Sequence, residues 1–387
     1  MIPVQYNLRS LMVRRATSLT TALVISLVVM ILFILSGFIE GLRATVLGSA
    51  VDGDWIVLSR GTTSEPDSFI TREQYEILRT RPQIAQDSKG QELISPEIIT
   101  GFNPAPEQAY AQVIFSYLRG VYPVAYEVHR GMHLEHGRWP APGASQFAIG
   151  RKLEARFPNL RLGREFRFGR RVWTIVGIFS DGGSARESEV ITNLDVLAED
   201  VHYANGFAAI HVTLRPGSSA SFAKSLSTDA RLRVDAISDA EFYATQTRFV
   251  DQLQTLGLAV AMLLAVGTVF GAMNTMYAAV ARRTEEIGVL RALGFGRLDI
   301  MLSFMAESML LGIAGGVLGE ILGLTAAYAV GLRSQLMNVG AFIFSFRLTT
   351  STFISTIVAA LTIGAAGGIL PAWRAARTSI IDSLRAL

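Results

Sequence analysis

The residues with the clearest potential for chemistry are three histidines and a glutamate within eight positions. His129, His133, Glu135 and His136 occur in the stretch HRGMHLEH, and imidazole and carboxylate groups at close spacing can hold a transition metal. On a helix, His129 and His133 would share one face, as in zinc peptidases. Gly131 and the following sequence GRWPAPG favour a strand and a turn instead. We therefore expect surface histidines and no metal site.

Other familiar catalytic motifs do not occur in the sequence. A loop of the form GxxxxGK[ST], which cradles nucleotide phosphates, is missing, and so is the GxSxG motif of serine hydrolases. The chain contains no Cys, which excludes disulfides, thiolate metal sites and thiol catalysis. We expect no catalytic residue and no cofactor on this chain.

Two glutamates interrupt a long apolar run, where a charged side chain needs a partner, water or an interfacial position. Glu307 follows Asp299 closely, so we expect it at the cytoplasmic edge of the membrane. Glu320 should lie near the middle of the membrane or toward its outer side. Two interpretations of Glu320 stay open: its charge serves the function, or it is a protonated or hydrogen-bonded structural carboxyl.

The composition indicates membrane helices combined with a soluble domain. Of 387 residues, 50% are hydrophobic and 17% are charged, which is too apolar for an ordinary soluble enzyme and too polar for a chain that lies wholly in the membrane. The net charge of the chain is only +3, and the arginines of the sequence are scattered among acidic residues. We therefore expect no nucleic-acid partner.

Four runs are long and apolar enough to span a bilayer, which takes about 20 residues of helix. We place them at residues 17–41, 249–281, 300–332 and 351–373. The first run is longer than the apolar part of a signal peptide and lacks a convincing cleavage site, so we expect it to be retained.

Arginines indicate the orientation of these spans. They cluster before the first span, between the second and third, and after the fourth, at Arg9, Arg14, Arg15, Arg282, Arg283, Arg291, Arg297, Arg374, Arg377 and Arg385. By the positive-inside rule, segments 1–16, 282–299 and 374–387 are cytoplasmic. Segment 42–248 and the loop 333–350 then lie outside.

The outer segment mixes strand-like and helix-like sequences. Runs such as DWIVLSR and RVWTIVGIF have the composition of strands, whereas TREQYEILRT reads as a helix. The predicted fold class is a membrane protein of four transmembrane helices, with a large α+β domain inserted between helices 1 and 2.

Glycines recur at four-residue spacing in the third run, and such small residues let helix backbones approach closely. The candidate packing residues are Gly312, Gly316, Gly319 and Gly323, with Gly315 beside them. Packing within one chain and packing between two chains would both use these faces, so homodimer and heterodimer are equally open.

The segment ARRTEEIGVLRALGFG between the second and third spans reads as a short amphipathic helix. Its apolar residues Ile287, Leu290 and Leu293 follow a helical spacing, and the charged residues around them are Arg282, Arg283, Glu285, Glu286 and Arg291. Gly294 and Gly296 can supply a left-handed cap. The helix could lie flat on lipid, but adjacent acids would be repelled by an anionic leaflet. Docking to a protein partner fits better.

This segment resembles a known family. The stretch NTMYAAVARRTEEIGVLRALGFGRLDIMLSFMAESMLLGIAGGVLG and the tail GGILPAWRAARTSIIDSLRAL are similar to the signatures of MacB/FtsX-type permeases. These are also called type VII ABC transporters and include DevC-like, LolC-like and LolE-like permeases. The stretch YLRGVYPVAYEVHRGMHLEHGRWPAPGASQFAIGRKLEARF resembles their periplasmic core domain. Glu320 departs from the family pattern, in which an apolar residue is expected.

The resemblance implies that Arg283 to Gly294 form a coupling helix seated on a cytoplasmic ABC ATPase dimer. ATP and Mg would be bound by that ATPase, which we expect on a separate polypeptide because the first span lies near the start of the sequence. The permease would pair with a second copy or a homologous permease in the lipid of a bacterial inner membrane, with both termini in the cytoplasm. A periplasmic adaptor and an outer-membrane channel are further candidate partners.

The implied function is mechanotransmission. ATP hydrolysis would drive a periplasmic conformational change that exports or extracts a small molecule, peptide, lipid or lipoprotein. The alternative is an FtsX-like regulator that activates a periplasmic cell-wall hydrolase. An outer domain of about 200 residues favours export, because it exceeds the size usual for the regulators. The sequence does not identify the substrate.

Overall fold

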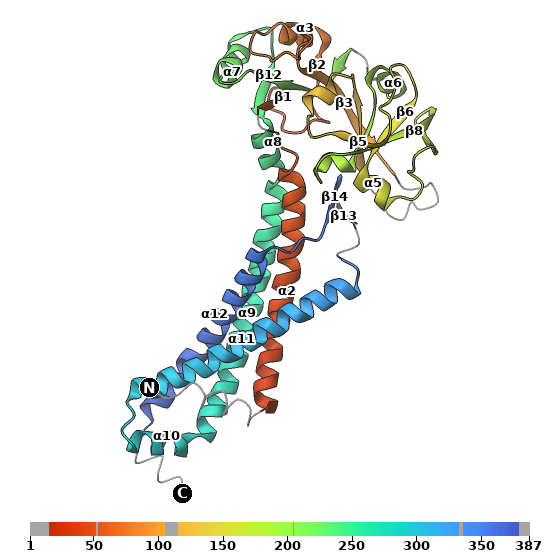
Figure 1. Ribbon diagram of the computed structural model, residues 1–387. Coiled ribbons are helices and arrows are strands. Elements are labelled where there is room, and N and C mark those ends of the chain that lie inside the picture. Colours follow the sequence, from red (N-terminus) through yellow and green to blue (C-terminus); the bar gives the residue numbers. More distant parts are fainter. Residues whose placement is uncertain (1–14, 52, 105–114, 204, 333–335, 379–387) are drawn as a thin grey trace. The chain divides into compact units, whose positions relative to one another are not determined.

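The computed structural model describes residues 15–51, 53–104, 115–203, 205–332 and 336–378. They form two compact units, each treated by itself below (Figure 1). The helical unit comprises the described residues of Met1–Glu40, Gln252–Arg333 and Arg347–Leu387. The α+β domain comprises those of Gly41–Asp251 and Ser334–Phe346.

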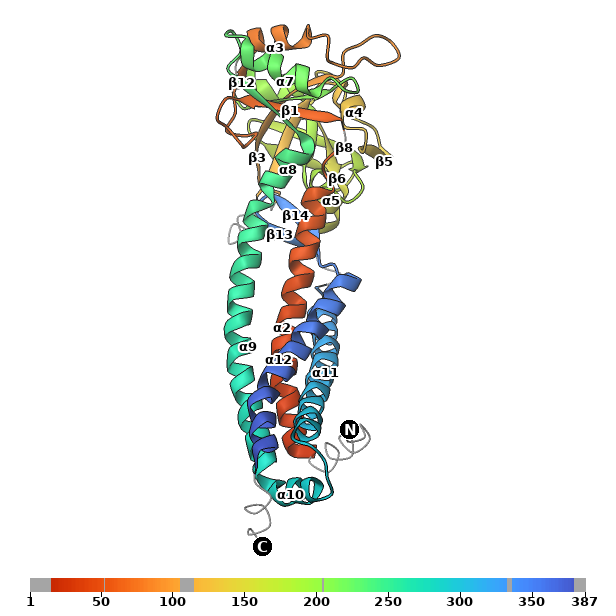
Figure 2. The same cartoon turned by 90° about the vertical axis from the view of Figure 1, so that its left-hand side faces the viewer.

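Four long helices make up most of the helical unit: α2 (Arg15–Leu47), α9 (Arg248–Arg282), α11 (Arg297–Ala329) and α12 (Thr350–Arg377). All four are long and apolar enough to cross a membrane. Together with the α+β domain between the first two, they confirm the predicted fold class. The short helix α10 (Thr284–Ala292) connects α9 to α11 (Figure 2).

The glycines of α11 divide between two neighbouring helices. A Cβ atom on Gly312 would lie 2.7 Å from the carbonyl oxygen of Ala360 in α12. One on Gly319 would lie 2.7 Å from the carbonyl oxygen of Ser26 in α2. Gly316 faces α12 in the same way, whereas Gly315 and Gly323 face α2. These small residues therefore serve close packing within the chain.

The α+β domain is built on a ten-stranded mixed sheet with the order β12-β1-β11-β3-β4-β9-β6-β8-β5, and β7 also pairs with β8. The strands are β1 (Asp54–Ser59), β3 (Ile94–Phe102), β4 (Ser116–Val121), β5 (His133–Gly137), β6 (Gln146–Gly150), β7 (Glu165–Phe168), β8 (Arg171–Ser180), β9 (Val190–Asn193), β11 (Ala209–Thr213) and β12 (Val234–Ser238). The short pair β2 (Ile70–Thr71) and β10 (Gly206–Phe207) lies apart from this sheet.

Short helices complete the domain. They are α3 (Arg72–Arg79), α4 (Ala125–Val128), α5 (Arg151–Arg156), the 3₁₀ helix η2 (Ala185–Ser188), α6 (Leu194–Asp200), α7 (Ser219–Thr228) and α8 (Asp239–Gln246). Side-chain caps begin several of them. Thr71 and Gln74, for example, form a reciprocal capping box at the start of α3, which satisfies two backbone N–H groups that the helix leaves free.

Strand β3 joins the two halves of the sheet. Its first half pairs with β11, from Ile94 to Glu97, and its second half pairs with β4, from Ile98 to Phe102. A separate hydrophobic core lies in each half, one containing the stacked rings of Phe147 and Trp173 and the other containing Phe222. The point where β3 changes partner therefore lies between the two hydrophobic cores, and we call it the junction of the sheet.

The segment expected as the loop 333–350 contains a hairpin of β13 (Leu336–Val339) and β14 (Phe342–Ser345). Ile343 is buried in the core that contains Phe147, and its backbone N–H donates to Ser188 Oγ at 2.9 Å. The hairpin is thus part of the α+β domain, although its chain neighbours are α11 and α12. Each strand of the hairpin has only four residues, which is too short for an alternation of apolar and polar residues to predict a strand.

We predict that Gly319→Leu forces α11 away from α2. The added side chain would meet backbone atoms of α2, and overpacking of this kind costs about 1–3 kcal/mol. The thermal unfolding temperature of the purified protein in mild detergent should fall. Gly267→Leu is the matched control, because a Cβ atom there meets no atom within 4 Å. An equal fall in both variants would contradict this packing.

Candidate functional site

Helix α10 and the residues beside it form the first candidate site, at the position predicted for the coupling helix (Figures 1 and 2). Gly294 follows the helix with φ +98°, a left-handed conformation that glycine adopts without steric cost. The prediction was wrong for Gly296, which has φ −70°. Its N–H donates to Asp299 Oδ2 at 3.0 Å, so Gly296 begins α11 rather than ending α10.

The apolar residues predicted to share one face of α10 differ in exposure. Ile287 is buried against Met276 and Phe304, and Leu290 is half-buried beside them. Leu293 lies just past the last helical turn and is 72% exposed. With Val289, Glu285 and Glu286 it forms the exposed surface of the segment, which we call the α10 outer face. Arg291 instead donates to the backbone oxygen of Thr378.

The side chain of Arg283 points toward α11. Its Nη1 lies 2.9 Å from Glu307 Oε2 in α11, and its Nε lies 2.8 Å from Glu286 Oε2 in α10. The guanidinium also stands over the ring of Phe304, 5.3 Å from its centroid. Arg283 and Glu307 are both buried. This ion pair fixes α10 to α11 and gives Glu307 the partner that its burial requires.

Glu320 also has a partner within the helical unit. The hydroxyl group of Thr356 in α12 donates to Glu320 Oε1 at 2.7 Å, and the Glu320 side chain is half-buried. This geometry agrees with the interpretation of a hydrogen-bonded structural carboxyl. A functional role for the charge of Glu320 stays a prediction.

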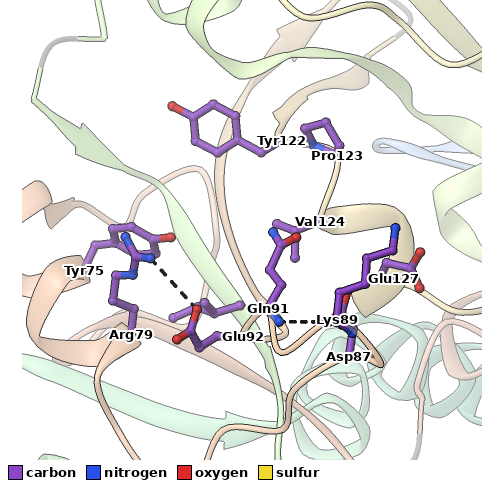
Figure 3. Close-up of a pocket in the computed structure, with 11 residues that line it drawn as sticks. Tyr75, Arg79, Asp87, Lys89, Gln91, Glu92, Tyr122, Pro123, Val124 and Glu127 are labelled. Carbon is purple, nitrogen blue, oxygen red and sulfur yellow. Dashed lines mark hydrogen bonds and ion pairs between the residues drawn. The ribbon is translucent and has the colours of Figure 1, made fainter.

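A polar pocket of about 500 Å³ opens in the α+β domain (Figure 3). The tyrosine rings of Tyr75 and Tyr122 line it, together with basic and acidic side chains. Arg79 Nη2 lies 3.9 Å from Glu92 Oε2, and the backbone N–H of Gln91 donates a hydrogen bond to Asp87 Oδ1 at 2.8 Å. The charges of these lining residues are mixed in sign, so the pocket favours no single charged ligand.

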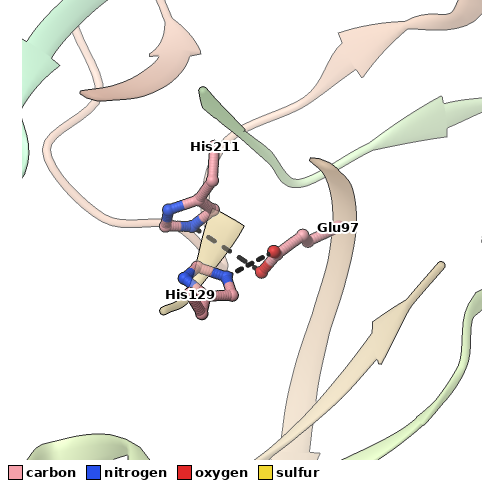
Figure 4. Close-up of side chains that lie close together, drawn as sticks. All are labelled: Glu97, His129 and His211. Atoms are coloured by element: carbon pink, nitrogen blue, oxygen red, sulfur yellow. Dashed lines mark hydrogen bonds and ion pairs between the residues drawn. The ribbon is translucent and has the colours of Figure 1, made fainter. Parts of the chain in front are cut away.

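The expectation of surface histidines was wrong for His129. His133 and His136 are exposed on β5, but His129 follows the single turn of α4, which carries its ring into the domain. Its Nε2 donates to Glu97 Oε1 at 2.7 Å (Figure 4). His211 of β11 lies beside it, with ring centroids 4.8 Å apart.

These histidines belong to a buried network of charges at the junction of the sheet. The guanidinium of Arg119 in β4 donates to three carboxylates, those of Glu65, Glu97 and Glu189, at distances between 2.6 and 3.2 Å. His211 Nε2 donates to Glu65 Oε1 at 2.8 Å. Sequence reasoning missed this network, because its members come from separate elements. The available signal was single charged residues within otherwise apolar strands.

The two imidazoles have different protonation preferences. Burial and the nearby Arg186 lower the pKa of His129 to about 3. Burial also opposes charge on His211, but the carboxylates of Glu97 and Glu65 outweigh it and raise the pKa of His211. Burial would raise the pKa of Glu97, yet both histidines and Arg119 hold it well below its ordinary value.

Two family models match the sequence. Residues 18–228, more than half of the chain, match the MacB-like periplasmic core domain, and residues 258–380 match the FtsX-like permease C-terminal domain. The first match contains the buried network, and the second contains α10 with the Arg283–Glu307 pair.

Similar proteins include permeases from archaea and bacteria. An uncharacterized ABC transporter permease of Methanocaldococcus jannaschii is 26% identical over 289 residues, which are 72% of this chain and 70% of the relative. The macrolide export ATP-binding/permease protein MacB of Bordetella avium is 38% identical over 133 residues, which are 34% of this chain and only 19% of that protein.

The periplasmic region of MacB from Actinobacillus actinomycetemcomitans, a solved crystal structure, aligns with 52% of this chain and 95% of its own length, at 12% identity and a TM-score of 0.38. The matches to the two family models carry the assignment. The chain belongs to the family of ABC transporter permeases that combine a MacB-like periplasmic core domain with an FtsX-like C-terminal domain.

Proposed function

We propose that this chain is the permease subunit of an ABC transporter whose ATPase is a separate chain. The ATPase dimer would bind ATP and Mg and would hold the α10 outer face. The observation that carries the proposal is a short helix whose inner side is anchored by Ile287 and Arg283. Its outer side offers Leu293, Val289 and Glu285 to a partner, together with Glu286, which is exposed but also paired with Arg283.

The chemistry of the α10 outer face supports a protein partner rather than lipid. Glu285 and Glu286 are both exposed next to Val289 and Leu293. Adjacent carboxylates are repelled by an anionic membrane surface, whereas a protein groove can pair them with basic side chains while it covers the apolar ones.

Arg283 gives a physical route from the ATPase to the membrane helices. A displacement of α10 would pull on Glu307 through a buried ion pair, and so move α11. The chain then leads from the helical unit to the α+β domain at three places, through α2, through α9 and through the hairpin β13–β14. We propose that this motion of the α+β domain, rather than passage through a continuous pore, exports or extracts the substrate on the periplasmic side of the membrane.

The proposed setting is a bacterial inner membrane, with both termini cytoplasmic and the α+β domain periplasmic. This orientation follows the distribution of arginines. A second permease copy or a homologous permease would complete the transporter. The relatives named for macrolide export support a small molecule as cargo, handed to an adaptor and an outer-membrane channel. Peptides, lipids and lipoproteins are the other cargo classes.

Affinity purification of the tagged chain in mild detergent tests this proposal. An ABC ATPase that co-purifies with an adaptor supports export. An ATPase recovered with a cell-wall hydrolase would instead favour the FtsX-like regulator, to which the match of residues 258–380 gives some weight. Recovery of no ATPase would contradict both functions.

We predict that Glu285→Lys and Leu293→Asp abolish ATPase binding without unfolding the permease. Both side chains are exposed, so the unfolding temperature should stay unchanged while ATPase co-purification and stimulation fall by tenfold or more. Glu73→Lys, an equivalent charge change on exposed α3, is the control. Normal stimulation in both α10 variants would show that the outer face does not bind the ATPase.

We predict that the Arg283–Glu307 pair is needed for transmission as well as stability. Arg283→Met leaves a carboxylate buried without its partner, which should lower the free energy of unfolding by about 3–5 kcal/mol. Arg283→Met combined with Glu307→Leu should regain stability but not ATP-driven movement, measured as a spin-label distance change in the α+β domain.

Arg282→Met is the control for this experiment, because Arg282 is the exposed neighbour of Arg283. Full ATP-driven movement in the stable double variant would refute transmission through the ion pair while leaving ATPase docking intact.

A further inference from the structure

Three buried side chains at the junction of the sheet aim their ligand atoms at one another. Glu97 comes from β3, His129 from the end of α4 and His211 from β11, and Figure 4 shows their polar atoms turned toward a common point. One ligand atom of each lies within 4.8 Å of the other two. Glu97, His129 and His211 are 0%, 2% and 1% exposed.

We propose that Glu97, His129 and His211 bind a divalent transition metal, with zinc as the ion that fits the donors best. Two imidazole nitrogens and one carboxylate oxygen form a donor set used by zinc in proteins. This proposal departs from the expectation of no metal, which considered only the contiguous stretch HRGMHLEH. It is independent of ATPase docking.

The interatomic distances are compatible with a tetrahedral ion. Ligands that each lie 2.0–2.1 Å from zinc are about 3.3 Å from one another. His129 Nε2 is 2.7 Å from Glu97 Oε1, and His211 Nε2 is 3.6 Å from Glu97 Oε2. These contacts reach different oxygens of Glu97, and one ligand atom of each residue lies within 4.8 Å of the other two. Metal entry would therefore draw the ligand atoms together by up to about 1.5 Å and would displace the Nε2 protons of both imidazoles.

The balance of buried charge also favours a divalent cation. Within the described part of the chain, Arg119 is the single guanidinium that contacts all three carboxylates of Glu65, Glu97 and Glu189. The group thus holds three acidic side chains around one guanidinium, and buried negative charge is stabilised by nearby positive charge. A divalent ion supplies that charge at the place where the histidine nitrogens converge.

Neighbouring side chains would orient the proposed ligands. Ser95 Oγ donates to Glu97 Oε1 at 2.9 Å, and Arg119 Nη1 donates to Glu97 Oε2 at 2.6 Å. Such hydrogen bonds behind a ligand commonly set its direction and raise metal affinity. Glu65 Oε1, 2.8 Å from His211 Nε2, is the nearest group that could complete four-coordination.

The ion would have a structural role. It would tie β3, α4 and β11 together at the point where β3 passes from one half of the sheet to the other. All three ligands are closed off from solvent, whereas a catalytic zinc keeps an open position for water or substrate. The two halves of the α+β domain would therefore separate more easily without the metal.

The test measures metal in the full-length protein purified in detergent. We expect one zinc per chain by elemental analysis after equilibration with zinc chloride and removal of excess. Cobalt(II) in its place should give the visible absorption of a tetrahedral site. Chelator treatment should lower the unfolding temperature, and added zinc should restore it. No bound zinc and no zinc-dependent stabilisation of the wild-type protein would overturn the proposal.

Variants assign the metal to these residues. His129→Gln and His211→Gln should each lose the ion, and Ser95→Ala should weaken its binding by about 10–100-fold. His133→Gln with His136→Gln is the matched control, because these histidines of the same stretch are exposed. Loss of zinc in that control instead would show adventitious surface binding. The cobalt spectrum of the wild-type protein remains decisive if a buried variant does not fold.

Discussion

A guanidinium group buried among apolar side chains needs acidic partners, and in the helical unit this requirement determines how α10 is held. Arg283 meets it with Glu307 of α11 and Glu286 of α10. The same contacts that neutralise the charge also join the loop segment to a membrane helix. A charged pair is a more directional tie than apolar packing, because losing one partner removes the main compensation of a charge that stays buried. The proposed conversion of ATPase movement into helix movement depends on this interaction.

The α+β domain uses a comparable arrangement at its own structural junction. Arg119 donates hydrogen bonds to carboxylates from a loop, from β3 and from the segment before β9. His129 and His211 donate to two of the same carboxylates. In both units, buried charge lies where separate elements must stay in register. The interiors of the two sheet halves are held by apolar packing, as in the stacked pair Phe147 and Trp173.

The membrane architecture could be predicted from the sequence, because a charge-free apolar run of about twenty residues is typical of a helix that spans a bilayer. The spacing of Ile287 and Leu290 likewise indicated a short helix before Gly294. It could not show that Arg283 turns inward, since its partner lies 24 residues away on another helix. His129 and Glu97 are 32 residues apart, and their meeting depends on strand order. The hairpin β13–β14 was missed because its burial comes from contacts with Ser188, far away in the sequence.

The most direct test of the central claim is site-specific cross-linking from the α10 outer face. The chain contains no Cys, so Leu293→Cys introduces a single thiol that can carry a short cross-linker in native membranes. We predict a covalent adduct with an ABC ATPase, identified by mass spectrometry, and no such adduct from the control Glu73→Cys in the α+β domain. Equal labelling from both positions, or adducts with lipid alone at position 293, would contradict the assignment of α10 as the ATPase-coupling helix.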